Sequence, residues 1–229
     1  MTWGFALYLA GNDSHRDTIL PSGLPAGSPE EALDCAGDLY LNALAPAIRV
    51  PAGLVVLVGP PASGKTSFVR ALIARRQIDT EAVVSSDEIR TELFGTSPVQ
   101  AESDAADARI FEERDRRIVA RLAAGRSALA ESTNVTPQAR ARLIAIARRF
   151  NAPVSMLRFN PGVTDLLQQY TERGRTDLTA ADVRAYAAIM TREASADQLR
   201  SEGAASVHDV PGRRQATTPA EAAAHFSFA

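Results

Sequence analysis

The sequence contains a single cysteine, Cys35, which excludes an internal disulfide and any metal site built from a cysteine cluster. Its three histidines, His15, His208 and His225, show no metal-ligand spacing. No apolar run reaches the length of a membrane-spanning helix, and the first residues lack the basic region and apolar core of a secretion signal. These absences predict a cytoplasmic protein that has no membrane partner.

Lysine is as scarce as cysteine, because Lys65 is the only lysine among 25 basic residues. A chain that uses arginine everywhere else indicates that this one position needs the compact ammonium group, which a planar guanidinium cannot imitate. With 27 acidic residues the net charge is −2, so the whole protein has no field that would attract a polyanion, although a local basic groove is compatible with it.

From Gly53 onward, short apolar runs alternate with helical segments, a pattern typical of a parallel α/β sheet covered by helices on both faces. The predicted strands are 54–58, 82–84, 127–130, 154–159 and a weaker 206–210. Helices are predicted near 65–75, 105–124, 137–150 and 163–172, with two more in 180–202 and a short one from Pro219. Thr136, Thr179 and Thr218 have the sequence context of helix N-caps. We therefore divide the chain into an extension, 1–50, and an α/β domain, 51–229.

The extension carries no recognisable chemistry. Trp3 to Leu9 predicts a strand, a turn-rich stretch follows, and Ser28-Pro29-Glu30-Glu31 predicts the start of a helix that ends before Pro46. We interpret this segment as a packing appendage or as a docking site for a protein partner.

The predicted strand 54–58 leads directly into Gly59-Pro60-Pro61-Ala62-Ser63-Gly64-Lys65-Thr66, which matches G-x-x-x-x-G-K-[ST] in full. Backbone N–H groups in such a loop point at phosphate oxygens at the positive end of the following helix. We expect the loop through Ser67 to bind ATP, Lys65 to reach the β- and γ-phosphates, and the Thr66 hydroxyl to be a ligand of Mg²⁺. This motif predicts nucleotide binding without naming the reaction.

Asp87 and Arg90 follow the second predicted strand, at the edge of the sheet where α/β proteins bind ligands. Asp87 is the natural general base for phosphoryl transfer to an alcohol, and Arg90, on the same helical face, could hold an anionic part of the acceptor. The alternative makes Asp87 a helix N-cap and Arg90 a solvated residue. The spacing does not decide between them.

Four motifs occur in one order along the chain: the phosphate loop, Ser85-Ser86-Asp87-Glu88-Ile89-Arg90, Glu131-Ser132-Thr133-Asn134, and Arg173-Gly174-Arg175-Thr176-Asp177. Over residues 53–210 this resembles the kinase domain of bacterial and phage polynucleotide 5′-hydroxyl kinases, within a broader group of P-loop kinases that includes zeta-type toxins. The resemblance implies that Asp87 is the base, that Arg90 contacts the phosphate beside the acceptor hydroxyl, and that Thr133 and Asn134 lie at the substrate. It also implies a helical lid near 170–190 whose arginine, Arg173 or Arg175, touches the transferring phosphates.

The chain departs from that family at two places. Glu131 stands where aspartate is usual, and it is predicted either to hold Mg²⁺ through water or to accept hydrogen bonds from loop N–H groups. Tyr170-Thr171 replaces an Arg-Asn pair of the lid, which leaves open which arginine acts. The sequence also lacks a D-x-D-x-T phosphatase motif and a spare lysine for a ligase.

Together these features predict an ATP-dependent kinase whose acceptor is a polynucleotide 5′-hydroxyl. Two alternatives stay open: a kinase for a small molecule such as a nucleotide sugar, an antibiotic or a metabolite, and a nucleotide-dependent switch that binds a partner through residues 1–50.

Overall fold

The computed structural model describes residues 47–95, 104–172, 174 and 178–229. The predicted strand at Trp3 and the predicted helix at Ser28 lie outside the described residues, and so do Arg173 and Arg175. What is described belongs to a single unit of the chain, Pro46–Ala229.

Five parallel strands form the central sheet in the order β3–β4–β2–β5–β6. They are β2 (Leu54–Val58), β3 (Val83–Ser85), β4 (Ala128–Glu131), β5 (Val154–Arg158) and β6 (Ser206–Asp209), each within one or two residues of its predicted bounds. All five residues of β2 are buried, as expected for an unbroken Leu-Val-Val-Leu-Val run at the centre of a sheet covered on both faces.

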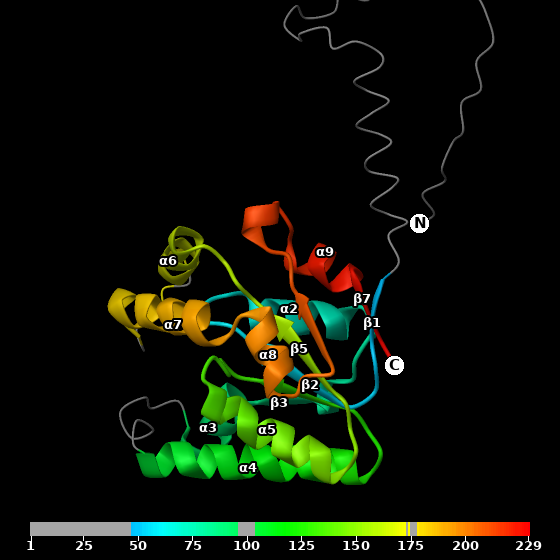
Figure 1. Ribbon diagram of the computed structural model, residues 1–229. Coiled ribbons are helices and arrows are strands. Elements are labelled where there is room, and N and C mark those ends of the chain that lie inside the picture. The colour runs from blue at the N-terminus through cyan, green and yellow to red at the C-terminus, as the bar shows by residue number, and fades with distance from the viewer. Residues whose placement is uncertain (1–46, 96–103, 173, 175–177) are drawn as a thin grey trace, which may run out of the picture. The chain divides into compact units, whose positions relative to one another are not determined.

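Helices cover both faces of this sheet, which confirms the predicted fold class (Figure 1). On one face lie α3 (Ser86–Phe94), α4 (Asp104–Ala123) and α5 (Pro137–Arg149); on the other lie α2 (Lys65–Ala74) and α9 (Pro219–Ala224). The helices α6 (Val163–Glu172) and α7 (Ala180–Glu193) pack on each other as a hairpin, and α8 (Ala196–Glu202) follows. The three predicted threonine caps are present, two of them as capping boxes.

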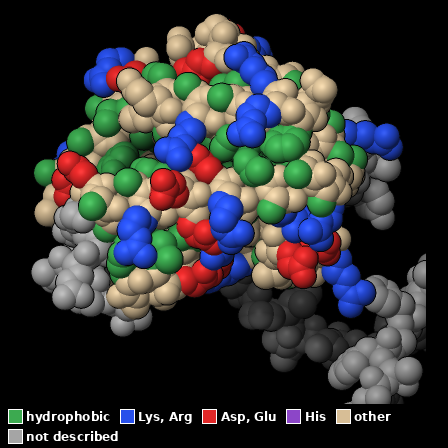
Figure 2. All heavy atoms as spheres, turned by 90° about the horizontal axis from the view of Figure 1, so that it is seen from below, with side chains coloured by type: hydrophobic (Ala, Val, Ile, Leu, Met, Phe, Trp, Pro, Cys, Tyr) green, Lys and Arg blue, Asp and Glu red, His purple; other side chains and the backbone are tan. Residues whose placement is uncertain are grey.

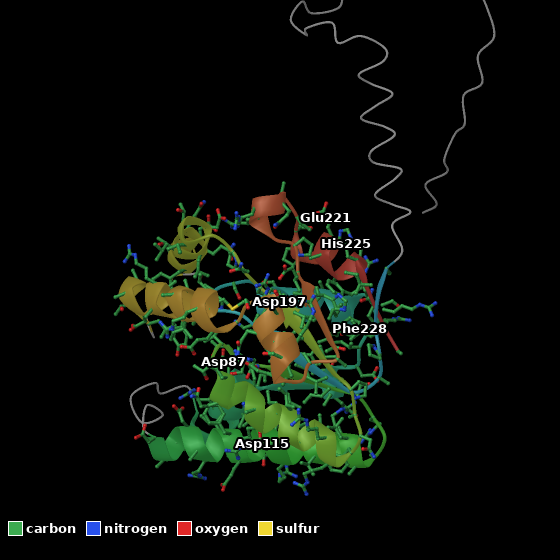
Figure 3. All side chains as sticks on the ribbon, viewed as in Figure 1. Asp87, Asp115, Asp197, Glu221, His225 and Phe228 are labelled. Atoms are coloured by element: carbon green, nitrogen blue, oxygen red, sulfur yellow. The ribbon has the colours of Figure 1, made fainter. Side chains whose placement is uncertain are left out.

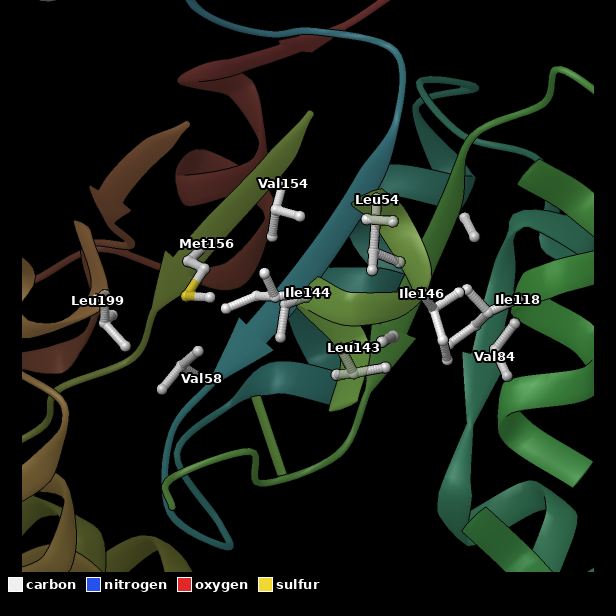
Figure 4. Packing of buried hydrophobic residues seen from close by; sticks show 14 of the residues in the cluster. Leu54, Val58, Val84, Ile118, Leu143, Ile144, Ile146, Val154, Met156 and Leu199 are labelled. Atoms are coloured by element: carbon white, nitrogen blue, oxygen red, sulfur yellow. The ribbon is translucent and has the colours of Figure 1, made fainter. Parts of the chain in front are cut away.

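The core divides at the sheet because side chains alternate along each strand. Leu54 and Val58 belong to the cluster beneath α4 and α5, whereas Leu57 belongs to the cluster beneath α2 and α9. Figure 4 shows the first cluster, in which Leu143 and Ile144 of α5 pack against the strands. The first cluster is built from aliphatic side chains and methionine, whereas the second also contains the aromatic rings of Phe68, Phe159 and Phe226.

A second, two-stranded sheet was not predicted. Its strands are β1 (Ile48–Val50) and β7 (Phe226–Phe228), which pair in parallel although they come from opposite ends of the domain. Phe226 is buried and its ring meets that of Phe68 edge-on at 5.6 Å, which fastens this sheet to α2. Within the described residues, no helix is both long enough and apolar enough to cross a membrane.

Candidate active site

The phosphate loop connects β2 to α2 in a conformation that its small residues permit. Gly64, the N-cap of α2, has φ 97°, and Ala62 has φ 62°, so the loop enters the left-handed region twice. A Cβ at Gly59 would lie 2.8 Å from the carbonyl oxygen of Phe159 and 2.7 Å from its Cβ, which explains glycine at that position. The loop therefore packs against the residue that follows β5 too closely for any side chain at Gly59.

Lys65 is folded back over this loop and is only 9% exposed. Its Nζ donates hydrogen bonds to the carbonyl oxygens of Gly59, at 2.8 Å, and Pro60, at 2.7 Å, and to Ser63 Oγ at 3.4 Å. The ammonium group thus lies inside the curl of the loop, where a bulky guanidinium would not fit in the same way.

Thr66 and Glu131 bring two hard oxygen groups together beside the loop. Thr66 Oγ1 donates to Glu131 Oε1 at 2.6 Å, and Glu131 is only 8% exposed at the end of β4. Burial raises the pKa of the Glu131 carboxyl above its ordinary value, and the Thr66 hydrogen bond and the Lys65 charge only partly oppose that shift. No group of three or more His, Cys, Asp or Glu side chains suited to a metal occurs in the described part of the chain. One carboxylate and one hydroxyl nevertheless fit Mg²⁺, which commonly takes few protein ligands and completes its shell with phosphate and water.

Asp87 lies one residue beyond the start of α3, directly after β3 (Figure 3). The N-cap of that helix is Ser85, whose Oγ accepts a hydrogen bond from the Glu88 N–H at 3.5 Å. The Asp87 side chain is exposed. Ser85, and not Asp87, is therefore the N-cap of α3, so the Asp87 carboxylate is available to the cleft.

A cleft of about 750 Å³ joins these groups, because Ser85 at the end of β3 lies in register with Glu131 at the end of β4. Nine residues line it: Thr66, Ser67, Arg70, Ser85, Asp87, Glu88, Thr91, Glu92 and Glu131. The predicted base, the phosphate-loop hydroxyl and the predicted metal carboxylate thus open onto one space, at the carboxyl ends of neighbouring parallel strands.

Arg90 occupies the outer part of α3 and is paired rather than directed at a ligand. Its Nη2 lies 2.9 Å from Asp107 Oδ1 of α4, and the two side chains are 37% and 47% exposed. An exposed ion pair of this kind is worth little and exchanges partners easily. Arg90 can therefore reach an anion only in competition with Asp107.

Thr133 and Asn134 follow β4 and are hydrogen-bonded to the start of the phosphate loop. The Gly59 N–H donates to the Thr133 carbonyl oxygen at 2.9 Å, and Asn134 Nδ2 donates to the Leu57 carbonyl oxygen at 2.9 Å. Asn134 is 2% exposed and has φ 46°, so its side chain supports the root of the loop, whereas Thr133 is only half-buried.

The surface of α4 and α5 mixes charges of both signs (Figure 2). Glu113 pairs with Arg116 at 2.7 Å and Arg117 at 2.8 Å, and these hydrogen bonds hold its pKa at about 2. Arg114, by contrast, is 2% exposed and donates to Asp115, which also pairs with Arg142. This face therefore offers balanced ion pairs instead of a continuous basic track.

Arg140, the most deeply buried charge in the described residues, was not predicted from the sequence. It lies in the first turns of α5 and is 0% exposed, although its neighbours in sequence look like an ordinary solvated helix. Arg140 lies four residues after the Thr136 cap and three before Leu143, on the apolar stripe of the helix. That spacing could have indicated a buried arginine.

The chain matches one protein-family model over most of the α/β domain. The family model described as AAA domain matches residues 54–199, which is more than half of the chain and spans the phosphate loop, Asp87 and Glu131. The chain belongs to the AAA domain family. The P-loop kinase fold predicted from the four motifs is thereby confirmed.

Solved structures share the fold at low identity. A chain of the Pnkp1/Rnl/Hen1 RNA repair complex matches with a TM-score of 0.54 and 21% identity, over 66% of this chain and 47% of that one. A putative kinase from Chloroflexus aurantiacus gives 0.52 and 17%, over 72% and 88%. A sugar kinase from a Janibacter species gives 0.54 and 16%, over 76% and 91%. This chain thus spans about half the length of the RNA-repair chain, and no curated protein matches it.

Proposed function

We propose that the protein transfers the γ-phosphoryl group of ATP to a hydroxyl group of an acceptor that binds in the cleft between α2 and α3. The observation that carries this proposal is the exposed Asp87 carboxylate, which lines the same cleft as Thr66 and Glu131 and caps no helix. A protein that only senses a nucleotide has no need of a free carboxylate facing the transferring group. The kinase hypothesis therefore explains a feature that the switch hypothesis leaves without a role.

On the phosphate side, ATP replaces the contacts that Lys65 makes within the loop. Its Nζ, now hydrogen-bonded to the Gly59 and Pro60 carbonyl oxygens, turns to the β- and γ-phosphates, while the loop from Gly59 to Ser67 offers its N–H groups. The ammonium group already lies inside the loop, so it exchanges two carbonyl partners for phosphate oxygens without crossing from another part of the site.

Thr66 and Glu131 would hold Mg²⁺. Bound Mg²⁺ neutralises charge on the β- and γ-phosphates and orients them. Glu131, whose raised pKa reflects an unfavourable burial of charge, would gain a compensating cation there, and the Thr66 hydroxyl would supply a second oxygen ligand.

Asp87 accepts the acceptor hydroxyl proton as that oxygen attacks the γ-phosphorus and the bond to the β–γ bridging oxygen breaks. Arg173 or Arg175, which lie outside the described residues, are proposed from the sequence resemblance to stabilise the developing charge. In the same proposal Thr133 contacts the acceptor, while Asn134 holds the loop in place through Leu57.

For the acceptor we propose a polynucleotide 5′-hydroxyl, in keeping with the motif order and with Arg90 one helical turn from Asp87. A guanidinium at that distance could bind the phosphate next to the hydroxyl in a bidentate manner once it leaves Asp107. The second candidate is a small hydroxyl compound. It is favoured by the cleft lining, in which Asp87, Glu88, Glu92 and Glu131 outnumber Arg70.

Radiolabelled ATP tests both candidates in one experiment, with 5′-hydroxyl DNA, 5′-hydroxyl RNA and a panel of sugars and antibiotics as acceptors. Wild-type protein and Asp87→Asn are compared, so that transfer by a contaminating kinase is recognised by its independence of Asp87. We expect label at 5′ ends with the wild type only. Efficient labelling of a small molecule with no labelling of any 5′ end would overturn the polynucleotide acceptor, and no labelling at all would overturn the kinase proposal.

A further inference from the structure

Arg140 joins the loop before its own helix to the ends of two helices more than 50 residues away in sequence. Its Nε and Nη2 each donate to the Glu202 carboxylate of α8 at 2.6 Å, Nη1 donates to the Asn134 carbonyl oxygen at 3.1 Å, and Nη2 donates to the Glu193 carbonyl oxygen at 2.6 Å. The side chain is fully buried, so these partners are fixed in direction. One guanidinium thus connects the β4–α5 loop, the last turn of α7 and the last turn of α8.

Two of these connections lead to the phosphate loop. Asn134 and its neighbour Thr133 bind the root of that loop at Leu57 and Gly59. On the other side, Val183 and Ala187 of α7 form a small apolar cluster with Leu166 of α6 and with Ala62, which lies in the loop itself. The position of α7 relative to the β4–α5 loop therefore determines how the phosphate loop is held from both sides.

The junction after α7 receives a second guanidinium. Arg158 of β5 donates to the Ala194 carbonyl oxygen at 3.3 Å, while its Nε and Nη2 bind Asp209 at 2.5 and 2.8 Å. The last carbonyls of a helix have no partner within the helix, and cationic side chains satisfy them while favouring the negative end of its dipole. Arg140 differs from Arg158 because it alone also reaches the β4–α5 loop.

A buried ion pair is weak evidence for a purely stabilising role, because an apolar pair of similar volume is often as stable or more so. An apolar pair cannot hold three hydrogen-bonding partners in fixed directions, whereas a planar guanidinium can. We propose that Arg140 is a positioning residue that fixes the α6–α7 hairpin relative to the β4–α5 loop and thereby fixes the phosphate loop between them.

The test compares Arg140→Met/Glu202→Gln with Glu202→Gln alone. The double variant removes the guanidinium without leaving a buried carboxylate unpaired, and the single variant keeps the Arg140 bonds to Asn134 and Glu193. Phosphoryl transfer, a readout that depends on the proposed function, is measured well below both melting temperatures. We expect kcat to fall by about 10-fold or more only in the double variant, since small displacements of reacting groups are costly, with KM for ATP changed by less than about 3-fold. Equal kcat in the two variants would overturn the proposal.

Hydrogen exchange supplies a readout that needs no activity, so failure of the kinase proposal can be told apart from failure of this one. In the double variant we expect faster exchange in Val163–Glu172 and Ala180–Glu193, with the pattern in Asp104–Ala123 unchanged. A uniform increase over all helices would show a merely structural role. If the double variant does not fold, Arg140→Lys replaces it, because lysine keeps the charge beside Glu202 but cannot reach all three partners. Arg140→Lys with unchanged kcat and unchanged exchange would contradict the proposal.

Discussion

The two sides of the cleft hold their polar groups in different ways. On the phosphate side, Lys65 and Glu131 are buried, and each has short hydrogen bonds to the loop or to Thr66. On the acceptor side, Asp87 is exposed, and Arg90 takes part in an ion pair that water reaches. The phosphate side is thus preorganised, whereas the acceptor side keeps its charges in groups that can exchange partners.

This difference agrees with the ligands proposed for each side. A triphosphate presents the same oxygens in every cycle, so a rigid loop with fixed donors binds it at low reorganisation cost. An acceptor must enter and leave past the side chains that recognise it, and exposed ion pairs cost little to open. Breaking the phosphate side should therefore abolish the reaction, whereas changes on the acceptor side should alter its rate or its selectivity.

The largest effect is expected at Lys65. Lys65→Ala should lower kcat/KM by about 10³-fold or more, because the transferring group loses the one ammonium that the sequence provides. Lys65→Arg should fail as well, since the loop encloses a point charge within reach of the Gly59 and Pro60 carbonyl oxygens. Transfer kinetics and binding of a fluorescent ATP analogue measure both. Full activity of Lys65→Arg would refute the role of the ammonium group.

Asp87→Asn should affect the chemical step more than nucleotide binding. We expect kcat to fall by about 10²-fold or more, the usual scale for loss of a general base, while the Kd for ATP changes only a few fold. Ser85 caps α3 independently, so the variant should keep its melting temperature. A collapse of ATP affinity in this variant would instead identify Asp87 as a metal ligand.

The sequence predicted the phosphate side better than the acceptor side for a physical reason. The loop, β2 and the start of α2 are contiguous, and their geometry follows from local residue types such as Gly64. The Arg90–Asp107 pair depends on how α3 and α4 meet, which periodicity does not specify.

Arg140 shows the same limit inside the core. The sequence predicted the helix at 137–150, but an arginine on its buried face connects other elements only when α7 and α8 bring Glu193 and Glu202 to it. The β1–β7 sheet was missed because three-residue strands from opposite ends of a domain leave almost no local pattern. The chemistry of a contiguous segment can thus be predicted from the sequence, whereas contacts between residues that the fold brings together cannot.

Asp107→Asn and Arg90→Ala should change the KM for a phosphate-bearing acceptor in opposite directions. Asp107→Asn should lower KM for an oligonucleotide with a phosphate next to its 5′ nucleoside by up to about 5-fold, since an exposed ion pair is worth at most about 1 kcal/mol. Arg90→Ala should raise that KM, with little effect on an acceptor that lacks the phosphate. Steady-state kinetics with the two acceptors measure both. Equal effects of Arg90→Ala on both acceptors would show that Arg90 does not bind the phosphate.

The smallest effect concerns stability, and it arises because Glu131 is buried with a raised pKa. A carboxyl whose pKa is higher in the folded protein than in the unfolded chain costs nothing while both states are protonated. As pH rises from its ordinary pKa of 4.5 through the folded value, the native state loses stability. Glu131→Gln stays neutral and keeps an oxygen that can accept a hydrogen bond from the Thr66 hydroxyl, so it avoids this loss.

In EDTA and without nucleotide, Glu131→Gln should therefore melt at a higher temperature than the wild type at pH 7, and the difference should shrink toward zero near pH 4, where the wild-type carboxyl is also protonated. Thermal melts over this pH range measure the difference, with Asp87→Asn as the control, because Asp87 is exposed on the same cleft. Added Mg²⁺ and ATP should reverse the order at pH 7, since a cation beside a charged Glu131 stabilises only the wild type. A difference that stays constant with pH would show that shape, and not the buried charge, separates the two proteins.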